Sequence, residues 1–162
     1  MKTLKDWVAS EVPELLLLRA RKLYEQRGYS RRWIDKRLRA VSTRHELTSE
    51  WYRRGARNSA EFRLLTNQLF RSAFGMDAAE YRRYKGLSGS RRSLRDHMTD
   101  LELALTSLAE TTAAVLHRSR SSSGIEQLLV DVADAGEIVA GTASDIERRS
   151  GRKVVESLNH LN

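Results

Sequence analysis

The sequence contains no cysteine, a single proline and no long apolar run. Without cysteine, the chain cannot form disulfides or thiolate metal sites. The leucine run at residues 15–18 is far shorter than the roughly 20 apolar residues that a membrane span needs. The basic N-terminal stretch also lacks the apolar core of a signal peptide. We therefore predict a soluble cytoplasmic protein that does not contact a membrane.

Strand-like patterns are equally scarce, with residues 153–155 as the only short candidate. Ala, Leu, Arg and Glu dominate instead, and these residues favour helices. The one proline, Pro13, is expected in the first turn of a helix that follows Ser10, where its missing N–H costs little. The sequence thus predicts an all-α protein.

Cap and stop signals divide the first 98 residues into short helices. We expect them at about residues 4–9, 11–27, 31–54, 59–73 and 78–85. The third could continue or bend near residues 42–43, and either Asn58 or Ser59 could cap the fourth. Trp33, Trp51 and Tyr52 are expected to be core anchors rather than surfaces on which bases stack.

Two longer helices follow. Thr99 and Glu102 form a capping box, and Ser123 and Glu126 have the spacing of a second one. Apolar residues recur in both helices at the spacing that packs one helix on another. The polar turn at residues 119–124 is short, so residues 99–150 are predicted to form an antiparallel helical hairpin. Residues 151–162 form a tail, ordered at most in part.

An isolated hairpin would leave its apolar faces open. We expect two copies to meet in a C2 dimer that forms a four-helix bundle. The alternative is packing of the hairpin on the N-terminal helices of the same chain. The predicted dimerisation residues are Leu101, Leu105, Leu108, Val115, Ile125, Val132, Val139 and Ile146.

Charge is distributed unevenly along the chain. Residues 1–98 hold 23 Lys and Arg against 11 Asp and Glu, whereas residues 99–162 hold 6 against 10. The planar guanidinium of arginine suits phosphates and base edges, so residues 1–98 are predicted to contact DNA, either duplex or single-stranded. An arginine-rich surface in an arginine-biased genome would give the same excess. The candidate nucleic-acid-binding residues are Arg31, Arg32, Lys36, Arg53, Arg54, Arg82, Arg83, Lys85, Arg91, Arg92 and Arg95.

Residues 59–98 have the rough outline of a helix-turn-helix, with a turn at Gly75. In that arrangement Arg82 and Arg83 would face a DNA groove.

Motifs of catalysis and metal binding are missing from the sequence. It has no H-E-x-x-H, no phosphate-binding loop and no G-x-G-x-x-G. His97 is expected to make a structural hydrogen bond, and carboxylate pairs such as Asp131 and Asp134 are expected on solvated helix faces. We predict that the protein is not an enzyme and uses no metal or cofactor.

One long stretch resembles a known family. The run ELTSEWYRRGARNSAEFRLLTNQLFRSAFGMDAAEYRRYKGL, followed by LRDHMTDLELALTSLAETT, resembles the C-terminal region of DNA-damage-inducible protein D (DinD) and the related BRO-type prophage antirepressors. The later segment IVAGTASDIERRSGRKVV is similar to the end of that region. The resemblance covers roughly residues 15–156.

The resemblance implies a bacterial or prophage protein of the DNA-damage or phage-repressor response. Members usually carry an N-terminal BRO domain, a small DNA-binding module, which this sequence is expected to lack. The first functional expectation is a nucleoid-associated regulator that binds DNA as a dimer. The alternative is an interaction module, an antirepressor or recombinase modulator, that binds a repressor or recombinase protein without touching DNA.

Overall fold

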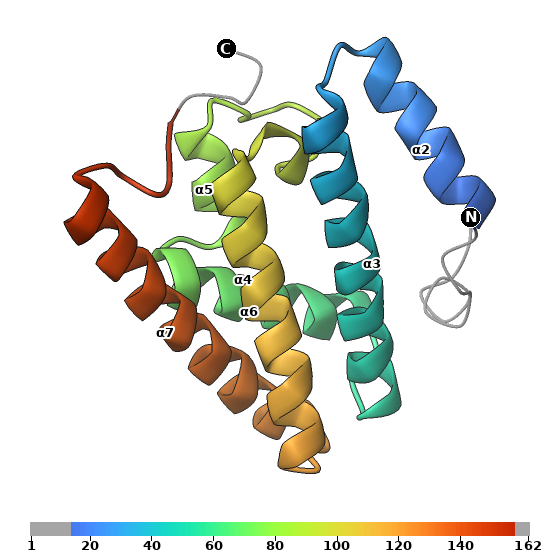
Figure 1. Ribbon diagram of the computed structural model, residues 1–162. Helices are drawn as coiled ribbons and strands as arrows, with labels where there is room; N and C mark the ends of the chain where they lie inside the picture. The colour runs from blue at the N-terminus through green and yellow to red at the C-terminus, as the bar shows by residue number, and fades with distance from the viewer. Residues whose placement is uncertain (1–13, 158–162) are drawn as a thin grey trace.

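A computed structural model describes residues 14–157, and every regular element within this range is helical, which confirms the predicted all-α class (Figure 1). The elements are α2 (Glu14–Gln26), α3 (Arg31–Arg53), α4 (Ser59–Phe74), α5 (Ala78–Tyr84), the 3-10 helix η1 (Arg95–His97), α6 (Asp100–Ser119) and α7 (Ile125–Ser150). Three predicted features lie outside the described residues: the helix at residues 4–9, the helix cap at Ser10 and the first-turn proline Pro13.

Most helix ends follow the local signals. Asn58, not Ser59, caps α4, and Thr99 forms the expected capping box with Glu102 at the start of α6. Helix α3 is continuous through residues 42–43. The second predicted capping box is wrong, because α7 begins after Gly124, which makes no side-chain cap bond.

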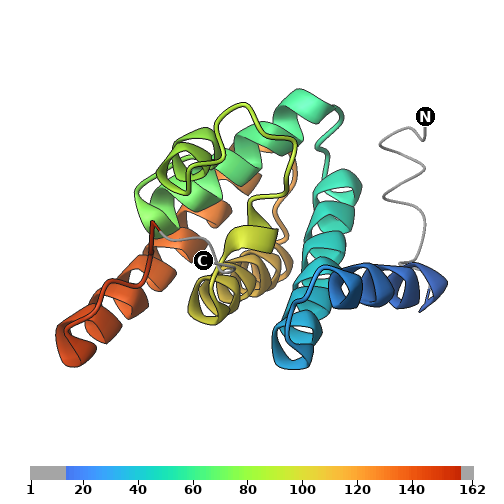
Figure 2. The same cartoon turned by 90° about the horizontal axis from the view of Figure 1, so that it is seen from above.

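Helix α6 lies between α3 and α7, and α4 crosses behind it (Figure 1). Helices α6 and α7 run in opposite directions, as the predicted hairpin requires. Helix α2 packs on α3, on the side that faces away from α7 (Figure 2). Helices α7 and α4 come close at Gly136, where a Cβ atom would lie 2.4 Å from the Cβ of Ser72.

Two apolar clusters form the core. One joins α4, α6, α7 and the end of α3 around Trp51, Leu65 and Val132. The other lies under the α2–α3 turn and the segment before α6, around Trp33 and Tyr81. Trp33 and Trp51 are both buried, which confirms that they are core anchors, while Tyr52 is half-buried.

The apolar spacing of the hairpin serves contacts within one chain. Leu105, Val132 and Val139 are buried in the first core cluster, so they cannot form an interface between folded copies. Ile125 and Ile146 are half-buried against the same cluster. This corrects the assignment of Leu105, Val132 and Val139 to a dimer interface. The hairpin packs on α3 and α4 of its own chain, and the C2 dimer stays a prediction.

The other three predicted seam residues stay on the surface. Leu101, Leu108 and Val115 are 37%, 42% and 48% exposed. They share one face of α6 with the exposed Ala104 and Thr111. We call these five residues the α6 stripe.

The tail is ordered in part. Val154 is buried against the first core cluster, and its N–H donates to Glu147 Oε1 at 2.9 Å.

Candidate nucleic-acid interface

The segment that links α5 to α6, residues 85–98, carries the densest group of predicted DNA contacts. Two glycines with positive φ, Gly86 and Gly89, turn the chain, and two leucines anchor it in the core. The guanidinium of Arg82 donates to the carbonyl oxygens of Ser90 and Arg92, at 2.5 and 2.6 Å. Arg82 therefore braces this linking segment and does not project into solvent, as a groove-reading side chain in the helix-turn-helix outline would.

Asp96 fastens the other end of the linking segment to α2 and α3. Its Oδ1 accepts hydrogen bonds from Tyr24 Oη and Arg37 Nε, both at 2.8 Å. Burial raises the pKa of Tyr24 to about 12, so this phenol stays a donor at neutral pH. The indole N–H of Trp33 donates to the carbonyl of Met98 at 3.2 Å. The segment is thus fixed at both ends before any ligand arrives.

A hollow of about 790 Å³ opens between the linking segment and the α2–α3 turn. Its lining consists of Arg27, Tyr29, Ser90, Arg91, Arg92, Ser93, Asp96 and His97. The three arginines are exposed, and none has a carboxylate partner within residues 14–157. Burial and then the charge of Asp96 raise the pKa of Tyr29, and the charges of Arg27 and Arg92 act in the opposite direction. We call this site the arginine hollow.

Further predicted DNA contacts lie on the helices that flank the α2–α3 turn and the linking segment. Arg31 and Arg32 begin α3 and Arg83 lies in the last turn of α5, all exposed. Asp100 neutralises part of this charge, because its Oδ2 lies 2.7 Å from Lys36 Nζ and 3.6 Å from Arg32 Nε. With the hollow, these residues make up the arginine-rich end of the protein, at the top of Figure 1.

The arginines at the other end of α3 are engaged. Glu50 pairs with Arg54 at 2.8 Å and Arg53 at 3.2 Å, and lies 3.9 Å from Arg118. Arg54 also donates to the carbonyl of Ser122 and so ties α3 to the turn before α7. Of the predicted contacts here, Arg53 is exposed but Arg54 has a structural role.

Lys85 is not available to a phosphate, which corrects its assignment as a DNA contact. Both its side chain and that of Glu102 are 0% exposed, and Lys85 Nζ lies 2.7 Å from Glu102 Oε2. The same carboxylate accepts hydrogen bonds from the Tyr81 hydroxyl and from the Thr99 N–H. This network joins α5 to the first turn of α6.

Arg95 is likewise internal, contrary to its assignment. Its Nη2 lies 2.6 Å from Oε1 of Glu110, which is fully buried in α6, and its guanidinium stands over Phe70. Arg44 approaches the same oxygen at 3.7 Å. Burial, and then the charge of Arg95, lower the pKa of Arg44 to about 10, so it remains a cation at neutral pH.

The sequence did not predict a second buried network of hydrogen bonds. His117 Nε2 accepts a hydrogen bond from the Trp51 indole at 3.1 Å, and His117 Nδ1 lies 2.8 Å from Asp131 Oδ2. Asp131 also accepts from Ser122 and Arg120, so it is not on a solvated face as expected, whereas Asp134 lies at the edge and pairs with Arg120. Because Trp51 occupies Nε2, the imidazole is not placed to take a proton from a hydroxyl, and Ser122 bonds to the carboxylate instead.

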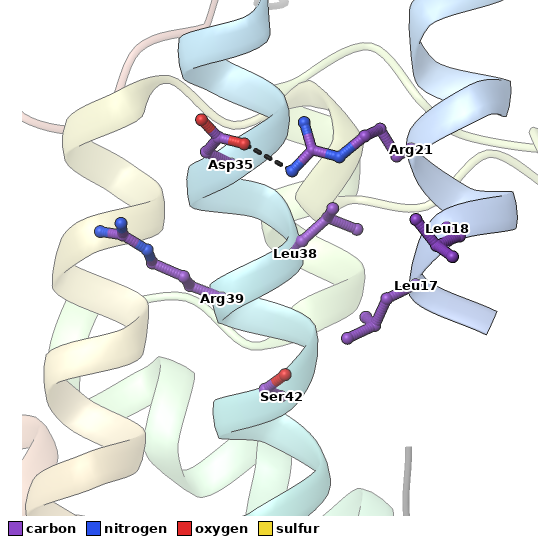
Figure 3. A pocket seen from close by; sticks show the side chains of 7 residues that line it. All are labelled: Leu17, Leu18, Arg21, Asp35, Leu38, Arg39 and Ser42. Atoms are coloured by element: carbon purple, nitrogen blue, oxygen red, sulfur yellow. Dashed lines mark hydrogen bonds and ion pairs between the residues drawn. The ribbon is translucent and has the colours of Figure 1, made fainter. Parts of the chain in front are cut away.

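A shallower groove lies between α2 and α3 (Figure 3). Leu17, Leu18 and Leu38 form much of its surface. An ion pair between Arg21 and Asp35, 2.6 Å long, closes one side. The carboxylate of Asp35 and the apolar surface make this groove a poorer site for a phosphate than the arginine hollow.

His97 has the structural role expected of it, since Nδ1 lies 2.9 Å from the Ser93 carbonyl oxygen. Within the described residues no group of three or more metal-ligand side chains comes together. None of the helices that the structure describes combines the length and the apolar character needed to cross a bilayer. No protein-family model matches the chain, and no curated protein or solved structure matches it significantly.

Proposed function

We propose that the protein binds DNA through its arginine-rich end and acts as a DNA-associated regulator. The observation that carries this proposal is the uneven pairing of the arginines. Arg27, Arg91 and Arg92 line one hollow and have no carboxylate partner among residues 14–157, whereas Arg53 and Arg54 pair with Glu50. Exposed guanidiniums on a backbone that the fold holds are suited to phosphate oxygens.

The fixed linking segment strengthens this argument. A ligand that binds mobile arginines must order them, at about 0.5–1.5 kcal/mol for each immobilised side chain. Here the backbone that carries Arg91 and Arg92 is already held by Arg82 and Asp96, so less ordering remains. The role in a DNA-damage or prophage response comes from the resemblance to the DinD and BRO-type proteins alone.

Fluorescence anisotropy with a labelled oligonucleotide, repeated over a series of salt concentrations, tests the proposal. Each neutralised phosphate should lower the logarithm of the affinity by about 0.7 to 0.9 per decade of salt. Charge reversal by Arg92→Glu should weaken binding and leave the melting temperature within a few degrees. No binding at low salt, or an affinity that does not change with salt, would refute the proposal.

A second candidate function is favoured by the α6 stripe. Leu101, Leu108 and Val115 recur every seven residues on one exposed face, with Ala104 and Thr111 between them. This spacing fits a helix–helix contact, either with another copy in a dimer or with a partner such as a repressor or recombinase. The interaction module and the DNA-binding regulator use different surfaces, so they can be tested separately.

Leu108→Glu tests this second function, because it places a charge in the middle of the α6 stripe and outside the core. If the stripe is a dimer interface, light scattering should show that the parent is a dimer and the variant a monomer, with little loss of helix content. Thr111→Glu offers a second charge on the same face. A parent that is monomeric at high concentration would exclude the dimer and leave only another protein as the partner.

A further inference from the structure

The arginine hollow differs in shape from a surface that grips duplex DNA. It is a concavity of about 790 Å³, within the range of about 300–1,000 Å³ typical of small-molecule pockets. Arg27 comes from the end of α2, whereas Arg91 and Arg92 come from the linking segment, so the cations stand on two walls. The space suits one nucleotide unit better than a continuous backbone.

Hydrogen bonds hold the floor of the hollow, and the carboxylate there is paired with an arginine. The Tyr29 hydroxyl donates to the carbonyl oxygen of Asp96 at 3.1 Å, and the His97 ring is held by the Ser93 carbonyl. The one carboxylate in the lining, Asp96, lies 2.8 Å from Arg37 Nε behind the floor. Because Arg37 compensates the charge of Asp96 inside the protein, Asp96 does not neutralise the arginines that line the hollow, and a ligand can pair with them.

A DNA duplex is a convex cylinder with its phosphates on the outside, and its two strands cannot both enter such a hollow. A single strand can turn one phosphate inward and bend its base aside. We propose that the arginine hollow receives one phosphate of single-stranded DNA, and that the protein therefore binds single strands more tightly than duplex. This inference rests on the proposed DNA binding and names the form of DNA that the site takes.

The test compares one labelled oligonucleotide of mixed sequence, alone and annealed to its complement, by anisotropy at low salt with the full chain. The single strand should bind at least about fivefold more tightly. Loss of a charge-assisted contact in Arg91→Ala or Arg92→Ala should weaken single-strand binding about tenfold. Arg63→Ala is the matched control, because Arg63 is exposed on α4, away from the hollow, and should change the affinity little.

A second variant separates shape from charge. Ser93→Trp would fill the hollow without removing any arginine, and the backbone carbonyl that holds His97 would remain. We expect it to reduce single-strand affinity to the duplex level and to leave duplex affinity unchanged. Equal or tighter duplex binding by the parent, or a Ser93→Trp variant that keeps its preference, would overturn this inference and leave the proposed DNA binding standing. Failure to bind either form would refute both.

Discussion

The buried ion pair between Lys85 and Glu102 gives the sharpest prediction about stability. Lys85→Met keeps the apolar stem of the side chain and removes its charge. Glu102 would then retain hydrogen bonds from Tyr81 and Thr99, but its carboxylate would have no cation in a position with 0% exposure. Breaking a buried pair in this way costs about 3–5 kcal/mol of the unfolding free energy.

The measurement is urea unfolding followed by far-UV circular dichroism. With an m-value of about 2 kcal/mol/M, the predicted loss lowers the unfolding midpoint by about 1.5–2.5 M. Arg83→Met is the matched control, since Arg83 is an exposed cation two residues earlier and its replacement should change stability by at most about 0.5 kcal/mol.

The double variant Lys85→Met/Glu102→Gln distinguishes charge from packing. Its amide oxygen can still accept from the Thr99 N–H, and its NH2 group can donate to the Tyr81 hydroxyl, so the double variant should recover at least about 1 kcal/mol relative to the single variant. If Lys85→Met unfolds at the same midpoint as Arg83→Met, Lys85 is not the buried partner of Glu102 and its assignment as a surface cation would have to be restored.

Two further predictions concern the glycines of α7 and the buried histidine of α6. Gly136→Ala should destabilise the protein by about 1–3 kcal/mol, because its new Cβ would overpack against Ser72. Gly141→Ala, whose new Cβ has no atom within 4 Å, should stabilise the protein by up to about 1 kcal/mol. Equal urea midpoints for the two variants would contradict this contrast. Burial lowers the pKa of His117 more than its bond to Asp131 raises it. Below about pH 6.5 the unfolded chain therefore binds more protons than the folded protein does. The free energy of unfolding should thus fall as the pH falls towards the pKa of His117 in the folded protein. Urea midpoints between pH 7.5 and 5.5 should show this decline in the parent and a smaller one in His117→Gln, and identical slopes would refute it.

Local patterns in the sequence predicted the helix ends well, because a cap depends on residues within a few positions of each other. Thr99 and Glu102 form their box within one turn. The capping box predicted at Ser123 does not form, because Gly124, at a φ of 86°, occupies the cap position and the Ser123 N–H donates to the side chain of Gln127. The spacing of a capping box is the same whether or not the hydroxyl turns toward the helix.

Periodicity predicted that α6 and α7 pack on other helices, but it could not name those helices. The interval of seven that includes Val132 and Val139 is directed at core residues of the same chain. At Gly136 the helix that comes close is α4, at Ser72. The partner depends on a contact across more than sixty positions of sequence, which no local pattern contains.

The count of charges along the chain predicted where the basic region lies. It wrongly placed two residues of that region, Lys85 and Arg95, on the surface. Lys85 and Arg95 were grouped with their neighbours because they are close in sequence to Arg82 and Arg92. Their carboxylate partners, Glu102 and Glu110, belong to the acidic part of the chain and meet them only after folding.

In the folded protein, ion pairs join the parts of the chain on either side of Thr99. Helix α6 inserts two buried carboxylates into the basic region, and Asp100 at its start neutralises Lys36. Each pair removes a cation from the surface, so the net charge of residues 1–98 overstates what a ligand meets. Within the described residues, no carboxylate of α6 pairs with Arg27, Arg91 or Arg92. The positions of the α6 carboxylates thus decide which cations of the basic region turn inward, and these three arginines are among those that stay exposed, at the hollow.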